Sequence, residues 1–177
     1  QRSRNAFRGL GRSVTRVLQF VSNPALLASE ITFAHSAELA AALSEGRGPK
    51  LRYVIKRARQ LAQEGQKVLI WSSFVSNVEY LATTLQDLGA VYIHGGTDAG
   101  DESDEDTREG KIRLFHSDPS VMALIANPAA AGEGISLHTV CHRAIYLDRN
   151  FNAAQYLQSE DRIHRLGLNP DQETVVE

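Results

Sequence analysis

From residue 50 onward, short apolar runs alternate with amphipathic segments, and this alternation restricts the chain to one fold class. The runs at 67–71, 121–126 and 144–147 are almost wholly apolar, which is typical of strands buried on both faces of a parallel sheet. Further strands are expected at 90–93 and, as a candidate, at 174–176; helices are expected at 51–62, 76–88, 108–115 and 152–166. Ser76 and Glu79 have the spacing of a capping box, and Gly89 predicts a helix end. Repeated strand–helix units predict an α/β fold, with a parallel sheet covered by helices on both faces in three layers.

Composition excludes several other classes of protein. The 177 residues are 42% hydrophobic and 23% charged, which is ordinary for a globular chain. The longest apolar run, Val121 to Ala126, is far below the ~20 residues that a membrane helix needs. Cys141 is the only cysteine, so the chain has no internal disulfide. Because the chain starts at Gln1 without methionine, we expect it to be part of a longer protein.

The net charge of -2 conceals two segments of opposite sign. Residues 1–29 carry five arginines and no acid, whereas residues 98–110 carry seven acids against Arg108. The basic segment has helical periodicity up to Asn23-Pro24, and its arginines form either a phosphate-binding ridge or a solvated face. The acidic segment is either a solvated loop or a surface that mimics DNA or binds a basic partner. We expect residues 1–48 to be a helical lead-in and residues 49–177 to be the main domain, truncated at its C-terminal end.

The segment from Gln158 to Gly167 carries the most specific chemistry. On a helix, Gln158, Asp161, Arg162 and Arg165 would share one face. Two guanidinium groups one turn apart are suited to a polyphosphate, and Asp161 would brace one of them. A surface salt-bridge cluster is the alternative.

A second candidate segment follows the apolar run at 121–126. Its small residues, among them Gly132 and Gly134, allow main-chain amides to approach a phosphate or sugar closely. By itself this pattern is also typical of a tight turn. The nearby His138, Cys141 and His142 lack the fourth ligand that a closed zinc site needs, so no metal is predicted in this chain.

In order, these segments resemble the second lobe of superfamily-two helicases, and most closely that of the Swi/Snf-type translocases of double-stranded DNA. The resemblance spans residues 14–177 and is carried by 67–74, 92–96, 130–137 and the final motif, Gln158-x-x-Asp161-Arg162-x-His164-Arg165-x-Gly167. That motif matches the family's Gln-x-x-Asp-Arg-x-His-Arg-x-Gly at every fixed position. Asp148 to Asn152 also resembles the family's Asp-x-x-Trp-Asn pattern, with Phe151 at the position of the usual tryptophan.

The resemblance implies a RecA-like lobe that works in an ATP-dependent motor. Arg162 and Arg165 would then be arginine fingers that face ATP, with Gly132, Gly134, Gln158 and Asp161 at the nucleotide cleft. The residues implied to face the DNA backbone are Ser72, Ser73, His94, Gly95 and Asn127. Pro128, Ala131 and Leu168 depart from the family pattern and affect the expected DNA and ribose contacts, but not the arginines.

The chain contains no phosphate-cradling loop of the form Gly-x-x-x-x-Gly-Lys-Ser/Thr. Asp104-Glu105 superficially resembles an Asp-Glu box, but it does not follow an apolar run. We therefore expect an N-terminal lobe of the same polypeptide to hold ATP and Mg²⁺, and we expect this chain alone to be inactive.

Other functions remain open at this point. The alternatives are a related superfamily-two motor that acts in restriction or phage defence or on RNA, and a non-catalytic docking module derived from such a lobe. No membrane partner is expected. The location would be cytoplasmic in a bacterium or archaeon and nuclear in a eukaryote.

Overall fold

A computed structural model describes residues 2–27, 41, 44, 48–131, 135–164 and 172–177. The chain forms two compact units, Gln1–Tyr53 and Val54–Glu177. This division falls inside a helix, and the predicted boundary after residue 48 stays a prediction. No helix in the described ranges is long and apolar enough to cross a membrane.

The first unit begins with the predicted amphipathic helix, α1 (Arg2–Ser22), followed by the short 3-10 helix η1 (Pro24–Leu27). Helix α1 ends where Asn23-Pro24 predicted, because a residue before proline disfavours helical dihedrals. The Asn23 side chain accepts a hydrogen bond from the Ala25 amide at 3.1 Å and so starts the next turn. Helix α3 (Gly48–Gln63) leads from this unit into the second one.

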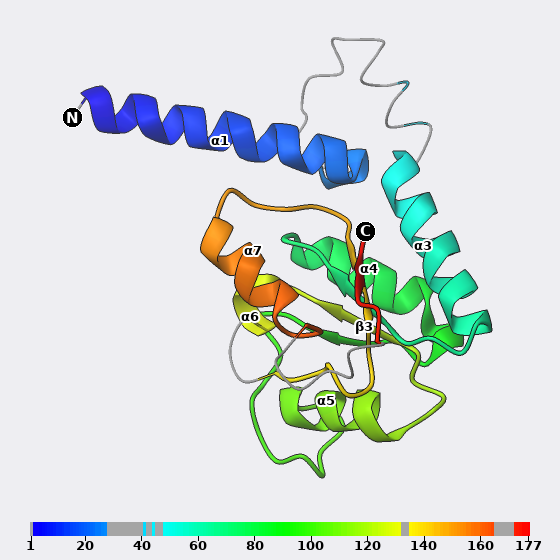
Figure 1. Ribbon diagram of the computed structural model, residues 1–177. Helices are drawn as coiled ribbons and strands as arrows, with labels where there is room; N and C mark the ends of the chain where they lie inside the picture. Colours follow the sequence, from blue (N-terminus) through cyan, green and yellow to red (C-terminus); the bar gives the residue numbers. More distant parts are fainter. Residues whose placement is uncertain (1, 28–40, 42–43, 45–47, 132–134, 165–171) are drawn as a thin grey trace. The chain divides into compact units, whose positions relative to one another are not determined.

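The second unit is built on a parallel sheet of five strands (Figure 1). The strands are β1 (Val68–Trp71), β2 (Val91–Ile93), β3 (Ala123–Ala126), β4 (Arg143–Tyr146) and β5 (Val175–Val176). They lie in the order β2-β3-β1-β4-β5, and every pair is parallel. Strands β1 and β3 are buried along their whole length, as their apolar runs predicted. The predicted α/β class and parallel sheet are confirmed.

Helices lie on both sides of this sheet. In Figure 1, α4 (Val75–Thr84) lies above the sheet and α5 (Arg108–Ser117) below it. The short helix α6 (Pro128–Ala131) directly follows β3, and α7 (Ala153–Glu160) follows β4. Trp71, Phe115 and Leu124 belong to the apolar core and are at most 1% exposed. The structure thus has the three layers that the sequence predicted.

The capping box predicted at Ser76 is not formed. Helix α4 begins one residue before Ser76, and its N-cap is Phe74, which makes no side-chain capping hydrogen bond. Instead, the Phe74 amide donates to the Ser72 hydroxyl at 3.2 Å, which links the loop to the end of β1. The helix also ends before Gly89, which closes the short 3-10 helix η2 (Gln86–Leu88) with φ 59°. A hydrogen bond between Phe74 and Ser72, two residues apart, thus takes the place of the predicted capping box.

The last helix is shorter than predicted. Helix α7 ends at Glu160, and Asp161 is its C-cap. Beyond this point the main-chain carbonyl of Arg162 accepts a hydrogen bond from the Leu137 amide at 2.9 Å. The chain therefore turns to pair with the segment after residue 134. Gln158 and Asp161 are exposed whereas Arg162 is buried, and Arg165, the fourth member of the predicted face, lies outside the described residues.

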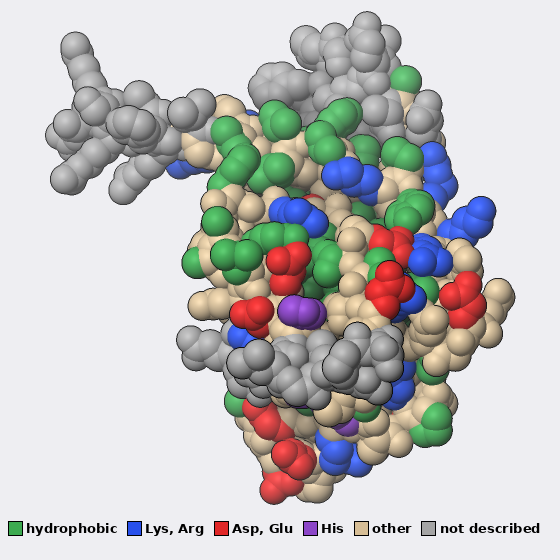
Figure 2. All heavy atoms as spheres, viewed as in Figure 1, with side chains coloured by type: hydrophobic (Ala, Val, Ile, Leu, Met, Phe, Trp, Pro, Cys, Tyr) green, Lys and Arg blue, Asp and Glu red, His purple; other side chains and the backbone are tan. Residues whose placement is uncertain are grey.

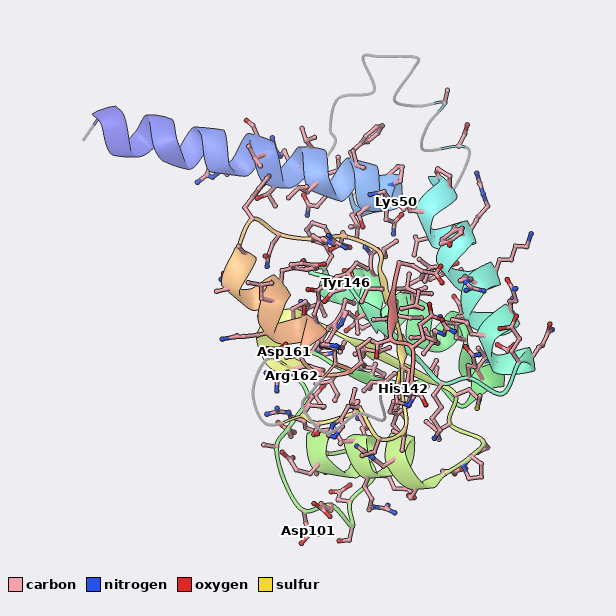
Figure 3. All side chains as sticks on the ribbon, in the orientation of Figure 1. Lys50, Asp101, His142, Tyr146, Asp161 and Arg162 are labelled. Carbon is pink, nitrogen blue, oxygen red and sulfur yellow. The ribbon has the colours of Figure 1, made fainter. Side chains whose placement is uncertain are left out.

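The acidic segment before α5 has a defined main-chain structure. The Thr107 hydroxyl lies 2.8 Å from the Asp101 carbonyl and 2.7 Å from the Asp104 carbonyl, and it accepts a hydrogen bond from the Gly110 amide at 3.1 Å. A Cβ at Gly110 would lie 1.8 Å from the Asp104 carbonyl oxygen, so this close approach requires glycine. Residues 101–106 all remain exposed. In Figure 3 the labelled Asp101 lies on this loop below α5.

The single cysteine is buried beside β1 and β4. Cys141 is 1% exposed, and its Sγ donates to the Lys67 and Arg143 carbonyls at 3.4 and 3.3 Å. Burial raises the pKa of this thiol from 9.0 to about 12.

We expect Cys141 to be unreactive toward a disulfide reagent at pH 8 until the chain unfolds, because the folded state holds it as a buried neutral thiol. Because the folded pKa is raised, this group should favour the folded state below about pH 9 and lose that contribution toward pH 12. Thiol titration with and without denaturant, followed by unfolding curves from pH 8 to pH 11, measures both effects. Rapid labelling of the folded chain would contradict the burial of Cys141.

Candidate functional site

The polar residues singled out from the sequence lie at one edge of the sheet. Strands β1, β2 and β3 end at Trp71, Ile93 and Ala126, and Ser72, Ser73, His94, Gly95 and Asn127 follow directly after them. Because the strands are parallel, all these residues lie at the carboxyl edge, where α/β folds bind ligands. The structure thereby brings Ser72, Ser73 and Asn127 together, and it places His94 and Gly95 at the end of the outermost strand, β2.

Side chains from two other strand ends hold the peptide groups of Ser73. The Ser73 amide donates to Asp148 Oδ1 at 2.7 Å, and Asn127 Nδ2 donates to the Ser73 carbonyl at 3.0 Å. The Ser72 hydroxyl donates to Asp148 Oδ2 at 2.7 Å and is completely buried. Ser72 therefore holds the Asp148 carboxylate from inside the fold and offers no surface to a ligand. The sequence singled out Ser72 but assigned no site role to Asp148.

Asn127 connects the loop after β1 to helix α6. Its Oδ1 accepts a hydrogen bond from the Ala129 amide at 2.9 Å, which caps α6, while its Nδ2 holds Ser73. Pro128 stands at the first position of α6, where its missing N–H is not needed. Asn127 is 9% exposed, so its polar atoms are directed into the protein.

His94 is fixed at the end of β2. Its ring stacks on Tyr92 with the centroids 5.4 Å apart, and its Nδ1 accepts a hydrogen bond from the Gly96 amide at 3.0 Å. Its Nε2 lies 3.6 Å from a carboxylate oxygen of Glu79 on α4. The exposed Gly95 beside it has open space at its Cβ position.

Arg162 lies just after α7 and is directed inward. Its Nη1 donates to the Ile135 carbonyl at 3.1 Å, and the residue is only 8% exposed. Gln158 and Asp161, which the sequence grouped with it, are exposed. Figure 3 shows Asp161 and Arg162 together at the end of α7. The other predicted nucleotide residues, Gly132, Gly134 and Arg165, lie outside the described residues.

An aromatic cluster between β4 and α7 was missed by sequence reasoning. Tyr146 Oη lies 2.5 Å from Ser159 Oγ, and the Tyr146 and Tyr156 rings lie 5.1 Å apart. The Arg149 guanidinium lies 4.8 Å from the Tyr146 ring centroid and 4.3 Å from that of Tyr156. Burial raises the pKa of Tyr146 from 10.0 to about 12. The tyrosine at the end of β4 and the Tyr156/Ser159 spacing on α7 were the only sequence signals, because the contact joins separate elements.

The titratable groups in the described ranges form no cluster of three or more that could hold a metal ion. His142, one of the residues considered for zinc, has its pKa lowered by burial and by the nearby charges of His138 and Arg143.

The sheet order and the polar carboxyl edge define the second unit as a RecA-like α/β lobe. The family model "Helicase conserved C-terminal domain" matches residues 49–167. The chain belongs to this family, and its relatives are Snf2-family ATP-dependent helicases. The predicted family and RecA-like fold are confirmed.

Individual proteins and solved structures that resemble this chain belong to the same group of helicases. Protein CHROMATIN REMODELING 19 of Arabidopsis thaliana is 31% identical over 67% of this chain, and ATP-dependent helicase fft2 of Schizosaccharomyces pombe is 29% identical over 67%. The chain spans only 15% and 9% of the length of these two proteins. The solved C-terminal part of the Fun30 ATPase domain matches with a TM-score of 0.60 and 27% identity, over 72% of this chain and 39% of that one.

Proposed function

We propose that this chain is the C-terminal motor lobe of an ATP-dependent translocase of double-stranded DNA. A first lobe of the same polypeptide would hold ATP and Mg²⁺, and this lobe would supply arginine fingers and contacts to the DNA backbone. The observation that carries the proposal is that the sequence contains the complete final motif, and that its Arg162, on the turn after α7, is held by the Ile135 carbonyl. Relatives named as ATP-dependent helicases support it.

The role proposed for Arg162 follows from its charge and its position. A guanidinium group stays charged at any physiological pH and stabilises the negative charge that develops on a phosphoryl group in transfer. With Nη1 bound to the Ile135 carbonyl, the side chain has a defined orientation before nucleotide arrives. Lobe closure would direct it and Arg165 to the γ-phosphate, with Gln158, Asp161, Gly132 and Gly134 lining the same cleft.

The proposed DNA contacts come from the carboxyl edge. Ser73, His94 and Gly95 would face the backbone phosphates, while Ser72 and Asn127 hold the loop that presents Ser73. This edge offers hydroxyl, amide and imidazole groups, which suit contacts to phosphate and sugar and not the reading of bases. The named curated relatives are eukaryotic, and one has chromatin remodelling in its name, so we propose a nuclear location.

The direct test compares the complete protein with the 177-residue chain. We expect duplex DNA to stimulate ATP hydrolysis by the complete protein, and we expect the chain alone to show no turnover with or without DNA. Phosphate release at saturating ATP, with single-stranded RNA as a control polymer, measures both. Turnover by the chain alone, or a complete protein without ATPase activity, would contradict the proposal; stimulation by RNA alone would favour an RNA motor.

A further inference from the structure

A small hollow opens at the carboxyl edge between the loop after β1 and the loop after β4. Ser73, Pro128, Asp148, Arg149 and Asn150 are among its lining residues. Its volume of about 10 Å³ admits roughly one water-sized atom. It is therefore far too small for a nucleotide, but it matches one oxygen atom of a phosphate group.

Arg149 brings a positive charge to this hollow in a fixed orientation. The side chain is exposed, and it makes no hydrogen bond or ion pair with another described residue. Its guanidinium lies over the rings of Tyr146 and Tyr156, which hold its plane while leaving its N–H groups available. A guanidinium held in this way loses little conformational entropy on binding an anion.

Ser73 contributes a hydroxyl that makes no hydrogen bond with any of the described residues. Its Oγ is buried and lacks a hydrogen-bond partner among the described residues, although its amide and carbonyl are both bound. Most buried polar atoms in proteins have a hydrogen-bond partner. The Ser73 hydroxyl, which lines the hollow, can therefore donate a hydrogen bond to an acceptor atom of a ligand that enters it.

The neighbouring carboxylate restricts what the hollow accepts. Asp148 also lines it, but its two oxygens accept hydrogen bonds from the Ser72 hydroxyl and the Ser73 amide. These donors offset part of its charge, and an anion at this position still needs the guanidinium of Arg149.

We propose that this hollow binds one non-bridging oxygen of a nucleic-acid backbone phosphate, with Arg149 supplying the charge and Ser73 Oγ a neutral hydrogen bond. The inference deepens the proposed function and rests on its DNA contact. Arg149 becomes a DNA-contacting residue at this edge, beyond those that the sequence indicated.

The two residues should leave different signatures in the salt dependence of duplex binding by the complete protein. Arg149→Gln should weaken binding about fivefold to tenfold and reduce the slope of log K against log salt concentration by about one, because one fewer counterion is released. Ser73→Ala should weaken binding about threefold with the slope unchanged, because a neutral donor releases no counterion. Arg149→Lys should retain the slope.

The matched control is Arg59→Gln, which removes an exposed arginine that pairs with Asp87 near the opposite edge of the sheet. It should leave affinity and slope unchanged. A wild-type protein without salt-dependent duplex binding would refute the proposed function itself. Normal wild-type binding with an unchanged slope in Arg149→Gln would refute the phosphate subsite. An unchanged slope with a raised KM for ATP would also refute it and assign Arg149 to the nucleotide.

Discussion

Replacing Arg162 with alanine is expected to lower kcat for ATP hydrolysis by the complete protein about 10³-fold or more while duplex DNA binding persists. The reason is that an arginine finger stabilises charge that exists in the transition state and adds little to the binding of the ground state. Phosphate release at saturating ATP and DNA measures kcat, and fluorescence anisotropy measures the affinity for DNA.

A structural contribution of Arg162 has to be separated from this effect. Its side chain is buried and donates to the Ile135 carbonyl, so the alanine variant also loses a buried hydrogen bond. Arg57→Ala is the control, because Arg57 is a partly buried arginine that also has a defined partner, Glu177 at 2.8 Å. We expect Arg57→Ala to lower stability without a comparable loss of kcat. Normal turnover by a folded Arg162→Ala protein would rule out the finger role.

Replacing Asp148 with alanine should lower the free energy of unfolding by about 3 kcal/mol, because two buried donors lose their acceptor. The donors are the Ser72 hydroxyl and the Ser73 amide, both 2.7 Å from the carboxylate. Ser72→Ala removes a donor and leaves the carboxylate bound to Ser73, so it should cost about 1 kcal/mol. Denaturant unfolding of the 177-residue chain measures both changes.

The control for Asp148 is Asp106→Ala, which removes an exposed carboxylate from the acidic loop and should leave the unfolding midpoint unchanged. If Asp148→Ala and Asp106→Ala unfolded at the same denaturant concentration, the Asp148 carboxylate would not be the link between the ends of β1 and β4. We also expect Asp148→Ala to weaken DNA binding, because the Ser73 amide would lose its acceptor and the loop would no longer be held in place.

The strands were predictable because the central strands of a parallel sheet are buried on both faces and therefore consist of short runs of apolar residues. The apolar runs at 67–71 and 121–126 contain the buried strands β1 and β3, which start one and two residues later than the runs and end where the runs end. The carboxyl edge was predictable for the same reason, because parallel strands bring the residues that follow them to one side. The start of α4 and the end of α7 were not predictable from the local pattern, because Asp148 holds the loop at 72–73 and the Leu137 amide binds the Arg162 carbonyl, both from distant segments.

The sequence by itself determined the family, the α/β class and the positions of the motifs, because these depend on residue types at short spacing. Only the tertiary structure decided how the polar atoms are used. It directs Ser72 inward to Asp148, places Arg162 against Ile135, and stacks Arg149 on two tyrosines. The physical reason is that a buried polar group must find its partner wherever the fold supplies one, and Asp148 meets Ser72 across 76 positions of the chain.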